Sequence, residues 1–69
     1  MAETVIYTIP GCPYCAAAKD DLRQRGVPYR EIDVAGDATA LEEMIVLSGD
    51  TMVPVIVEGS NVTKGFGGG

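Results

Sequence analysis

Two cysteines separated by two residues lie at the point where a β-strand is expected to end and a helix to begin. Residues 4–9 are dense in β-branched and aromatic side chains, which favours a strand, and Pro10-Gly11 ends it. The segment Cys12-Pro13-Tyr14-Cys15 follows directly. Proline is favoured at the first position of a helix because its missing N–H would be unpaired there anyway. The chain is therefore predicted to open with a strand, a tight turn and a helix whose first turn carries both cysteines.

The rest of the chain predicts one further helix and three further strands. The first helix is expected from Pro13 to about Arg25, because Cys15, Ala18 and Leu22 share one helical face. The later elements are expected, in chain order, as a strand over 28–34, a helix from about Thr39 to Gly49, a strand over 53–58 and a strand over 62–64.

The order of these elements, β-α-β-α-β-β, predicts an α/β fold with a four-stranded mixed sheet. The opening strand–helix–strand unit requires a parallel pair, and the closing hairpin adds antiparallel strands. Thr39 and Glu42 match the Thr-x-x-Glu pattern of a capping box, so we expect Thr39 to cap the second helix. With 69 residues there is room for one core, and we expect a single domain over residues 1–69.

Composition and charge exclude several classes of function. The net charge of −5 disfavours binding to nucleic acid or to an anionic membrane. The absence of histidine excludes a Ser-His-Asp triad, and no apolar run approaches the roughly 20 residues that span a bilayer. Residues 1–4 lack the basic and apolar character of a secretory signal. We therefore expect a cytoplasmic protein, most simply a monomer, that bears a pair of thiols.

A Cys-x-x-Cys pair between a strand and a helix favours thiol–disulfide chemistry. At the cap position, Cys12 faces the free N–H groups and the positive end of the helix, which favour its thiolate. Such surroundings lower a cysteine pKa from about 8.5 to between roughly 3.5 and 7.5. We interpret Cys12 as the attacking thiol and Cys15, one turn inward, as the thiol that resolves the mixed disulfide.

Two other interpretations of the cysteine pair are open. A structural disulfide across two residues closes a very short loop and stabilises by only roughly 2 kcal/mol. A zinc site usually takes four ligands from cysteine and histidine, so two cysteines need a second chain or an external thiol to complete it. An iron–sulfur cluster held between two chains by Cys12 and glutathione is the corresponding binding-module hypothesis.

The chain resembles the glutaredoxins, which have the thioredoxin-like fold. Tyr7-Thr8-x-Pro10-Gly11-Cys12-Pro13-Tyr14-Cys15 is similar to their active-site signature, and Lys19 to a basic residue that many carry one turn later. Met52-Val53-Pro54 resembles their Thr-Val-Pro, whose proline is cis and faces the cysteines. The resemblance implies a substrate groove lined by Tyr14, Met52, Val53, Pro54, Gly65 and Phe66.

Two departures from the glutaredoxin pattern concern glutathione. Many members have a lysine or arginine where this chain has Ile9, so the thiolate at Cys12 is expected to depend mainly on the helix start, with Lys19 assisting. The Gly-Gly-x-Asp-Asp segment that opens a last helix and holds the glutamyl group is replaced by Gly65-Phe66-Gly67-Gly68-Gly69, so that helix is expected to be short or absent. The Gly-Phe pair is more similar to the hydrogen-donor redoxins of ribonucleotide reductase, the NrdH type.

The resemblance implies a thiol–disulfide oxidoreductase that reduces protein or glutathione mixed disulfides. It implies no bound cofactor, with glutathione as co-substrate and disulfide-bearing proteins as partners. The alternative within this class is an NrdH-type hydrogen donor that thioredoxin reductase reduces.

Overall fold

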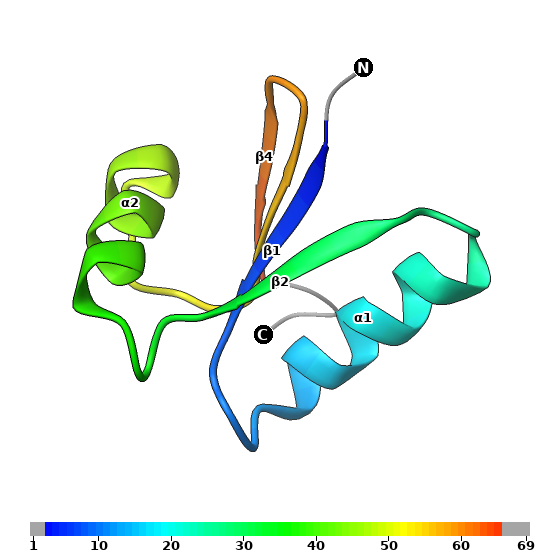
Figure 1. Ribbon diagram of the computed structural model, residues 1–69, viewed down its shortest axis with the longest axis horizontal. Helices are drawn as coiled ribbons and strands as arrows, with labels where there is room; N and C mark the ends of the chain where they lie inside the picture. The colour runs from blue at the N-terminus through cyan, green and yellow to red at the C-terminus, as the bar shows by residue number, and fades with distance from the viewer. Residues whose placement is uncertain (1–2, 66–69) are drawn as a thin grey trace.

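The computed structural model describes residues 3–65. Its six elements follow in the predicted order, and each boundary lies within about two residues of its predicted place (Figure 1). They are β1 (Thr4–Thr8), α1 (Pro13–Gln24), β2 (Tyr29–Asp33), α2 (Ala38–Ser48), β3 (Val55–Glu58) and β4 (Asn61–Lys64).

The strands form one four-stranded mixed sheet in the order β2-β1-β3-β4. β1 pairs parallel with β2 and antiparallel with β3, and β3 pairs antiparallel with β4. The predicted thioredoxin-like architecture is confirmed. The expectation for a short or missing last helix concerns residues 66–69, which lie outside the described residues.

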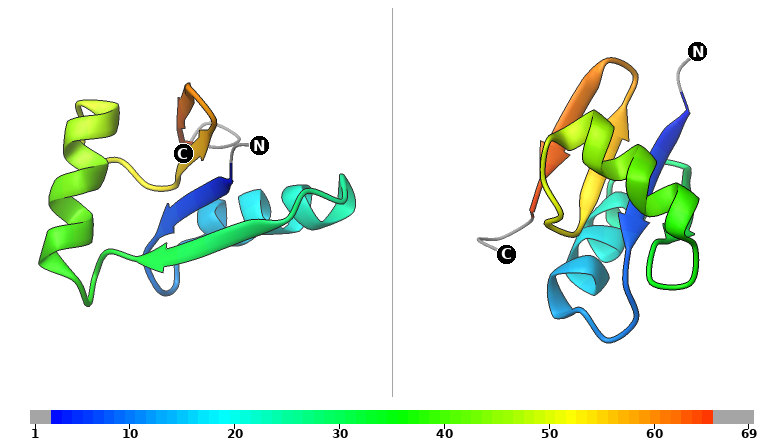
Figure 2. Two further views of the ribbon diagram at one scale, coloured as in Figure 1. Left: turned by 45° about the horizontal axis from the view of Figure 1, so that its top comes forward. Right: turned by 90° about the vertical axis from the view of Figure 1, so that its left-hand side faces the viewer.

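The two helices cover opposite faces of the sheet (Figure 2). Successive residues of a strand point to opposite faces, and the core divides accordingly into two clusters. On the α1 face, Ala18 and Leu22 pack with Ile6 of β1 and Ile56 of β3. On the α2 face, the cluster of buried residues consists of Tyr7, Val34, Ala40, Met44 and Val55.

β2 contributes different side chains to the two faces. Tyr29 packs against the cluster beneath α1, whereas Ile32 packs against the cluster beneath α2. Since side chains alternate along a strand, Glu31 lies on the same face as Tyr29, the face that α1 covers. This alternation brings Glu31 to the helix that carries the cysteines.

The start of α2 differs from the prediction. Asp37, not Thr39, is the cap, and its carboxylate accepts hydrogen bonds from the backbone N–H groups of Thr39 and Ala40 at 3.0 and 3.1 Å. The predicted capping box is therefore wrong, because an aspartate two residues earlier satisfies the free N–H groups of the first turn. The end was predicted correctly: Gly49 has a φ of 74° and closes the helix.

Neither helix between residues 3 and 65 is long and apolar enough to cross a membrane.

Candidate active site

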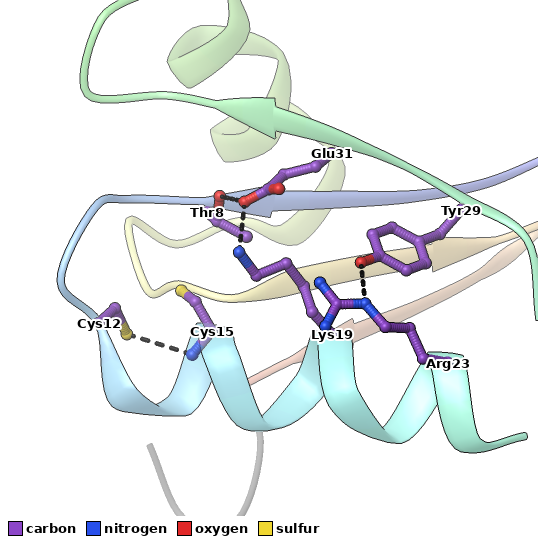
Figure 3. Close-up of polar contacts among 7 residues, drawn as sticks. All are labelled: Thr8, Cys12, Cys15, Lys19, Arg23, Tyr29 and Glu31. Atoms are coloured by element: carbon purple, nitrogen blue, oxygen red, sulfur yellow. Dashed lines mark hydrogen bonds and ion pairs between the residues drawn. The ribbon is translucent and has the colours of Figure 1, made fainter.

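Cys12 is the cap residue of α1. Its backbone is extended, with φ −86° and ψ 116°, and Pro13 takes the first helical position, as predicted. The Cys12 sulfur accepts a hydrogen bond from the Cys15 backbone N–H at 3.4 Å (Figure 3). The Cys12 carbonyl accepts the first intrahelical bond from the Ala16 N–H at 3.1 Å. The tight turn and the proline together direct the N–H groups of the helix start toward this sulfur.

The pKa of Cys12 is lowered and the pKa of Cys15 is raised. The Cys15 thiol, donating a hydrogen bond, is the largest cause that lowers the pKa of Cys12, and the Cys15 backbone N–H is the second. Burial is the largest cause that raises the pKa of Cys15, which is 2% exposed. The backbone N–H groups of Cys15 and Tyr14 at the helix start thus lower the pKa of Cys12, as expected, and the Cys15 thiol is the largest single cause besides them.

A hollow of about 700 Å³ lies beside the two cysteines. It is bounded by the end of β1, the turn after it, the first turns of α1 and the end of β2. Its lining includes both cysteines and three charged residues, which are Lys19, Glu31 and Asp33. A disulfide that enters this hollow reaches a free, partly exposed thiol with a lowered pKa, and a second free thiol stands one turn behind it.

Lys19 is held by an ion pair across the hollow. Its Nζ lies 2.9 Å from Glu31 Oε2, and the Thr8 hydroxyl donates to the same oxygen at 2.8 Å (Figure 3). Lys19 and then Thr8 are the largest causes that lower the pKa of the Glu31 carboxyl. The positive charge of Lys19 lowers the pKa of Cys15. The prediction that Lys19 assists Cys12 is thus replaced by a contact with Glu31 and an effect on Cys15.

Comparison with known proteins identifies the family. The Glutaredoxin family model matches residues 4–62 of the chain. The chain belongs to the glutaredoxin family. It is similar to glutaredoxin 3 of Escherichia coli, with 48% identity over 56 residues that cover 81% of this chain and 68% of that protein.

Two solved structures share the glutaredoxin architecture of this chain. The crystal structure of glutaredoxin Grx-1 from Archaeoglobus fulgidus has a TM-score of 0.88 and 27% identity, over 99% of this chain and 79% of that one. The NrdH-redoxin of Escherichia coli has a TM-score of 0.82 and 30% identity, over 93% of this chain and 83% of that one. With its two cysteines in the glutaredoxin arrangement, the chain is a thiol–disulfide oxidoreductase.

Ile9 lies at the position where, by the resemblance described above, many glutaredoxins have a lysine or arginine. It follows β1, is 38% exposed and lines the same hollow as Cys12. The predicted position beside the nucleophile therefore agrees with the structure. An exposed apolar side chain at this place leaves Lys19, which is already paired with Glu31, as the cation in the described lining of the hollow.

The segment before β3 has the backbone geometry that the glutaredoxin resemblance implied. The Val53–Pro54 peptide bond is cis, as predicted, and Pro54 is buried. The Gly65 N–H donates to the Pro54 carbonyl at 2.8 Å, which joins the end of β4 to this segment.

The other predicted groove residues are placed as follows. Tyr14 and Met52 are exposed and Val53 is half-buried, whereas Phe66 lies outside the described residues. The hollow beside the cysteines is lined by other residues, so the structure does not bring the predicted groove residues into it.

Sequence reasoning missed Glu31 and Thr8. Glu31 contacts Lys19, and Thr8 contacts Glu31, yet the three residues lie on different elements and far apart in the sequence. A signal was available, since Cys15 and Lys19 are one turn apart on α1 and Glu31 is an acidic residue on the strand face toward that helix. Between residues 3 and 65, no group of three or more potential metal ligands gathers.

Proposed function

We propose that this glutaredoxin reduces protein disulfides and glutathione mixed disulfides, with Cys12 as the nucleophile and Cys15 as the resolving thiol. The observation that carries the proposal is the difference between the two thiols. Cys12 is partly exposed at the helix start and has a lowered pKa, whereas Cys15 is buried and has a raised pKa. Because the thiolate is the attacking form, the more acidic and more accessible thiol reacts first.

The reaction proceeds by two exchanges of a sulfur–sulfur bond. The Cys12 thiolate attacks one sulfur of the substrate disulfide, forms a mixed disulfide and releases the other substrate sulfur as a thiolate. Cys15 then loses its proton to water and attacks the Cys12 sulfur. The bond between Cys12 and the substrate breaks, and the second substrate thiolate takes up a proton from solvent. The substrate gains two electrons, and the protein ends with a Cys12–Cys15 disulfide.

A substrate segment is proposed to lie along Val53 and Pro54, with Tyr14, Met52, Gly65 and Phe66 completing the groove. Val53 precedes the ladder of β3, which begins at the Tyr7–Val55 pair, so its backbone is available to pair with an added strand. The exposure of Tyr14 and Met52 agrees with a role in contacting a partner.

Glutathione is the proposed co-substrate and reductant, without any bound cofactor. Family membership supports this, although Ile9 gives the glycyl carboxylate of glutathione no cation to pair with. A charge-assisted hydrogen bond contributes about 1.5–3 kcal/mol, so we expect weak binding of glutathione. We propose a monomer in the cytoplasm, where thiols are kept reduced.

A second candidate is an NrdH-type donor that thioredoxin reductase reduces. The similarity of the chain to the NrdH-redoxin favours it. A coupled assay separates the two by following NADPH consumption with glutathione plus glutathione reductase, or with thioredoxin reductase alone. Turnover that saturates at low glutathione concentration would contradict the weak binding proposed above.

The roles of the cysteines are tested with dithiobis-nitrobenzoate, an aromatic disulfide that releases a coloured thiolate. The reduced protein should release two equivalents in two phases, and Cys15→Ser should release one equivalent and retain the adduct on Cys12. Cys12→Ser should lose the fast phase, since a serine hydroxyl is not ionised at neutral pH. An adduct on Cys15, with Cys12 dispensable, would reverse the assignment.

A further inference from the structure

A chain of polar side chains begins one helical turn from Cys15. Lys19 follows Cys15 by four residues on α1, which puts the two on one face of the helix. Lys19 donates to Glu31 at 2.9 Å, and Thr8 donates to the same carboxylate oxygen at 2.8 Å. The three residues come from α1, β2 and β1, and Thr8 is 2% exposed. Glu31 is thus fixed from the sheet, and it fixes the end of a side chain that would otherwise be mobile.

We propose that Thr8 and Glu31 hold the Lys19 ammonium beside Cys15, and that Lys19 thereby promotes the attack of Cys15 on a mixed disulfide at Cys12. The inference rests on the proposed order of the two cysteines and adds the residues that assist the second exchange. Thr8 and Glu31 are positioning residues, because they act through Lys19.

The second exchange is the step that needs assistance. Cys15 is buried, and burial disfavours the charged thiolate that must form there. When Cys12 is joined to a substrate, it no longer carries a thiol that can donate to or accept from Cys15. Two features of the hollow then favour the Cys15 thiolate: the hydrogen bond from the Ile9 backbone, which is the larger, and the positive charge of Lys19.

The charges around Cys15 come from three places. Lys19 faces it from α1, Glu31 and Asp33 face the hollow from β2, and Cys12 faces it from the helix start. Figure 3 draws the Lys19 ammonium between the Cys15 sulfur and the Glu31 carboxylate, which agrees with the lowering of the Cys15 pKa by Lys19. The positive member of the ion pair is therefore the nearer one.

This order of charges predicts opposite effects from the two members of the ion pair. Lys19→Gln removes the nearer positive charge and leaves Glu31 ionised, so the pKa of Cys15 should rise. Glu31→Gln removes the negative charge but keeps a side-chain oxygen that can accept from Lys19 and Thr8, so the ammonium stays in place uncompensated and the pKa of Cys15 should fall. If the ion pair had a purely structural role, both variants would shift the pKa of Cys15 in the same direction.

The expected magnitude follows from a charge one helical turn away. A unit charge about 6 Å away changes the thiolate population by a factor of roughly three to ten, for effective dielectric constants between about 80 and 40. The nucleophilicity of a thiolate falls with its pKa, with a Brønsted slope of about 0.4–0.5, so roughly half of the effect on a logarithmic scale reaches the rate. Lys19→Gln should slow the second exchange about two- to threefold at neutral pH, and Glu31→Gln should accelerate it by less.

The experiment follows the second release of thionitrobenzoate by stopped flow, with the reagent in excess. The rate of this phase is recorded against pH for the wild type, Lys19→Gln, Glu31→Gln and the double variant. We expect the pH midpoint to rise in Lys19→Gln, to fall in Glu31→Gln and to lie near wild type in the double variant. Lys19→Arg keeps the charge and should restore the wild-type profile.

Arg23→Gln is the matched control, because it removes a positive charge one turn farther along α1 from Cys15. It should change the second phase less than Lys19→Gln does. Equal slowing by Arg23→Gln, or shifts of the same sign in Lys19→Gln and Glu31→Gln, would overturn the inference. Failure of the proposed cysteine roles is separate, since the wild type would then release a single equivalent or Cys12→Ser would keep the first phase.

Discussion

A substitution at Met44 should measure most directly how much the core beneath α2 contributes to the stability of the protein. It is completely buried at the centre of the cluster between α2 and the sheet. Met44→Ala removes the buried thioether chain and leaves a cavity, and such substitutions cost about 2–5 kcal/mol in free energy of unfolding. Val46→Ala is the control on the same helix, because Val46 is 83% exposed. Surface substitutions of that kind stay within about 0.5 kcal/mol.

The cost at Met44 is large for a domain of this length. At about 0.05–0.15 kcal/mol per residue, a chain of 69 residues has a free energy of unfolding of roughly 3.5–10 kcal/mol. A loss of about 2 kcal/mol lowers Tm by roughly 8–16 °C in a domain of this size. Urea titration and thermal unfolding followed by circular dichroism measure both quantities.

The same variant tests whether the two layers act separately. Below its unfolding transition, Met44→Ala should react with dithiobis-nitrobenzoate in the first phase at the wild-type rate, because α1 and Cys12 lie on the other face of the sheet. Equal stability of Met44→Ala and Val46→Ala would refute the assignment of the α2 core. A slow first phase in the folded variant would refute the independence of the site from that core.

Four further predictions concern charge and caps. Ile9→Lys should increase the thiolate population of Cys12 by roughly three- to sevenfold, for a charge about 7 Å away and effective dielectric constants between about 80 and 40. Ultraviolet titration of the thiolate on the Cys15→Ser background measures this population. The control Ile9→Gln, which adds no charge, should not increase it. Burial raises the pKa of Cys15, so its contribution to stability is present at neutral pH and lost as pH rises past the ordinary thiol pKa. The free energy of unfolding of Cys12→Ser, measured by urea titration, should therefore fall in that pH range. A variant that also lacks Cys15 should show a smaller fall. Asp37→Ala should cost about 0.5–2 kcal/mol in urea unfolding, whereas an equal cost for Thr39→Ala would contradict the observed cap. Because the net charge is −5, added salt should accelerate the first exchange at Cys12 with an anionic disulfide and slow the same exchange with cationic cystamine. The same response to salt from both reagents would contradict electrostatic steering.

The fold could be predicted where one signal in the sequence dominated its surroundings. The apolar positions Cys15, Ala18 and Leu22 are the buried residues of α1, because a 3.6-residue period is unambiguous over three turns. The start of α2 offered two competing signals instead. Asp37 and Thr39 both suit a cap, and only the path of the chain from β2 decides which of them meets the free N–H groups.

The site divides in the same way between local and distant determinants. The cap position of Cys12 depends on residues within one turn, and the burial of Cys15 follows from the apolar period of α1, so the sequence predicts both. The contact of Lys19 with Glu31 spans the α1–β2 connection and depends on the parallel register that pairs Ile6 with Glu31. A shift of that register by one residue would turn Glu31 to the α2 face, because side chains alternate along a strand. The acidity of Cys12 is thus set locally, whereas the charge beside Cys15 depends on how β2 pairs with β1.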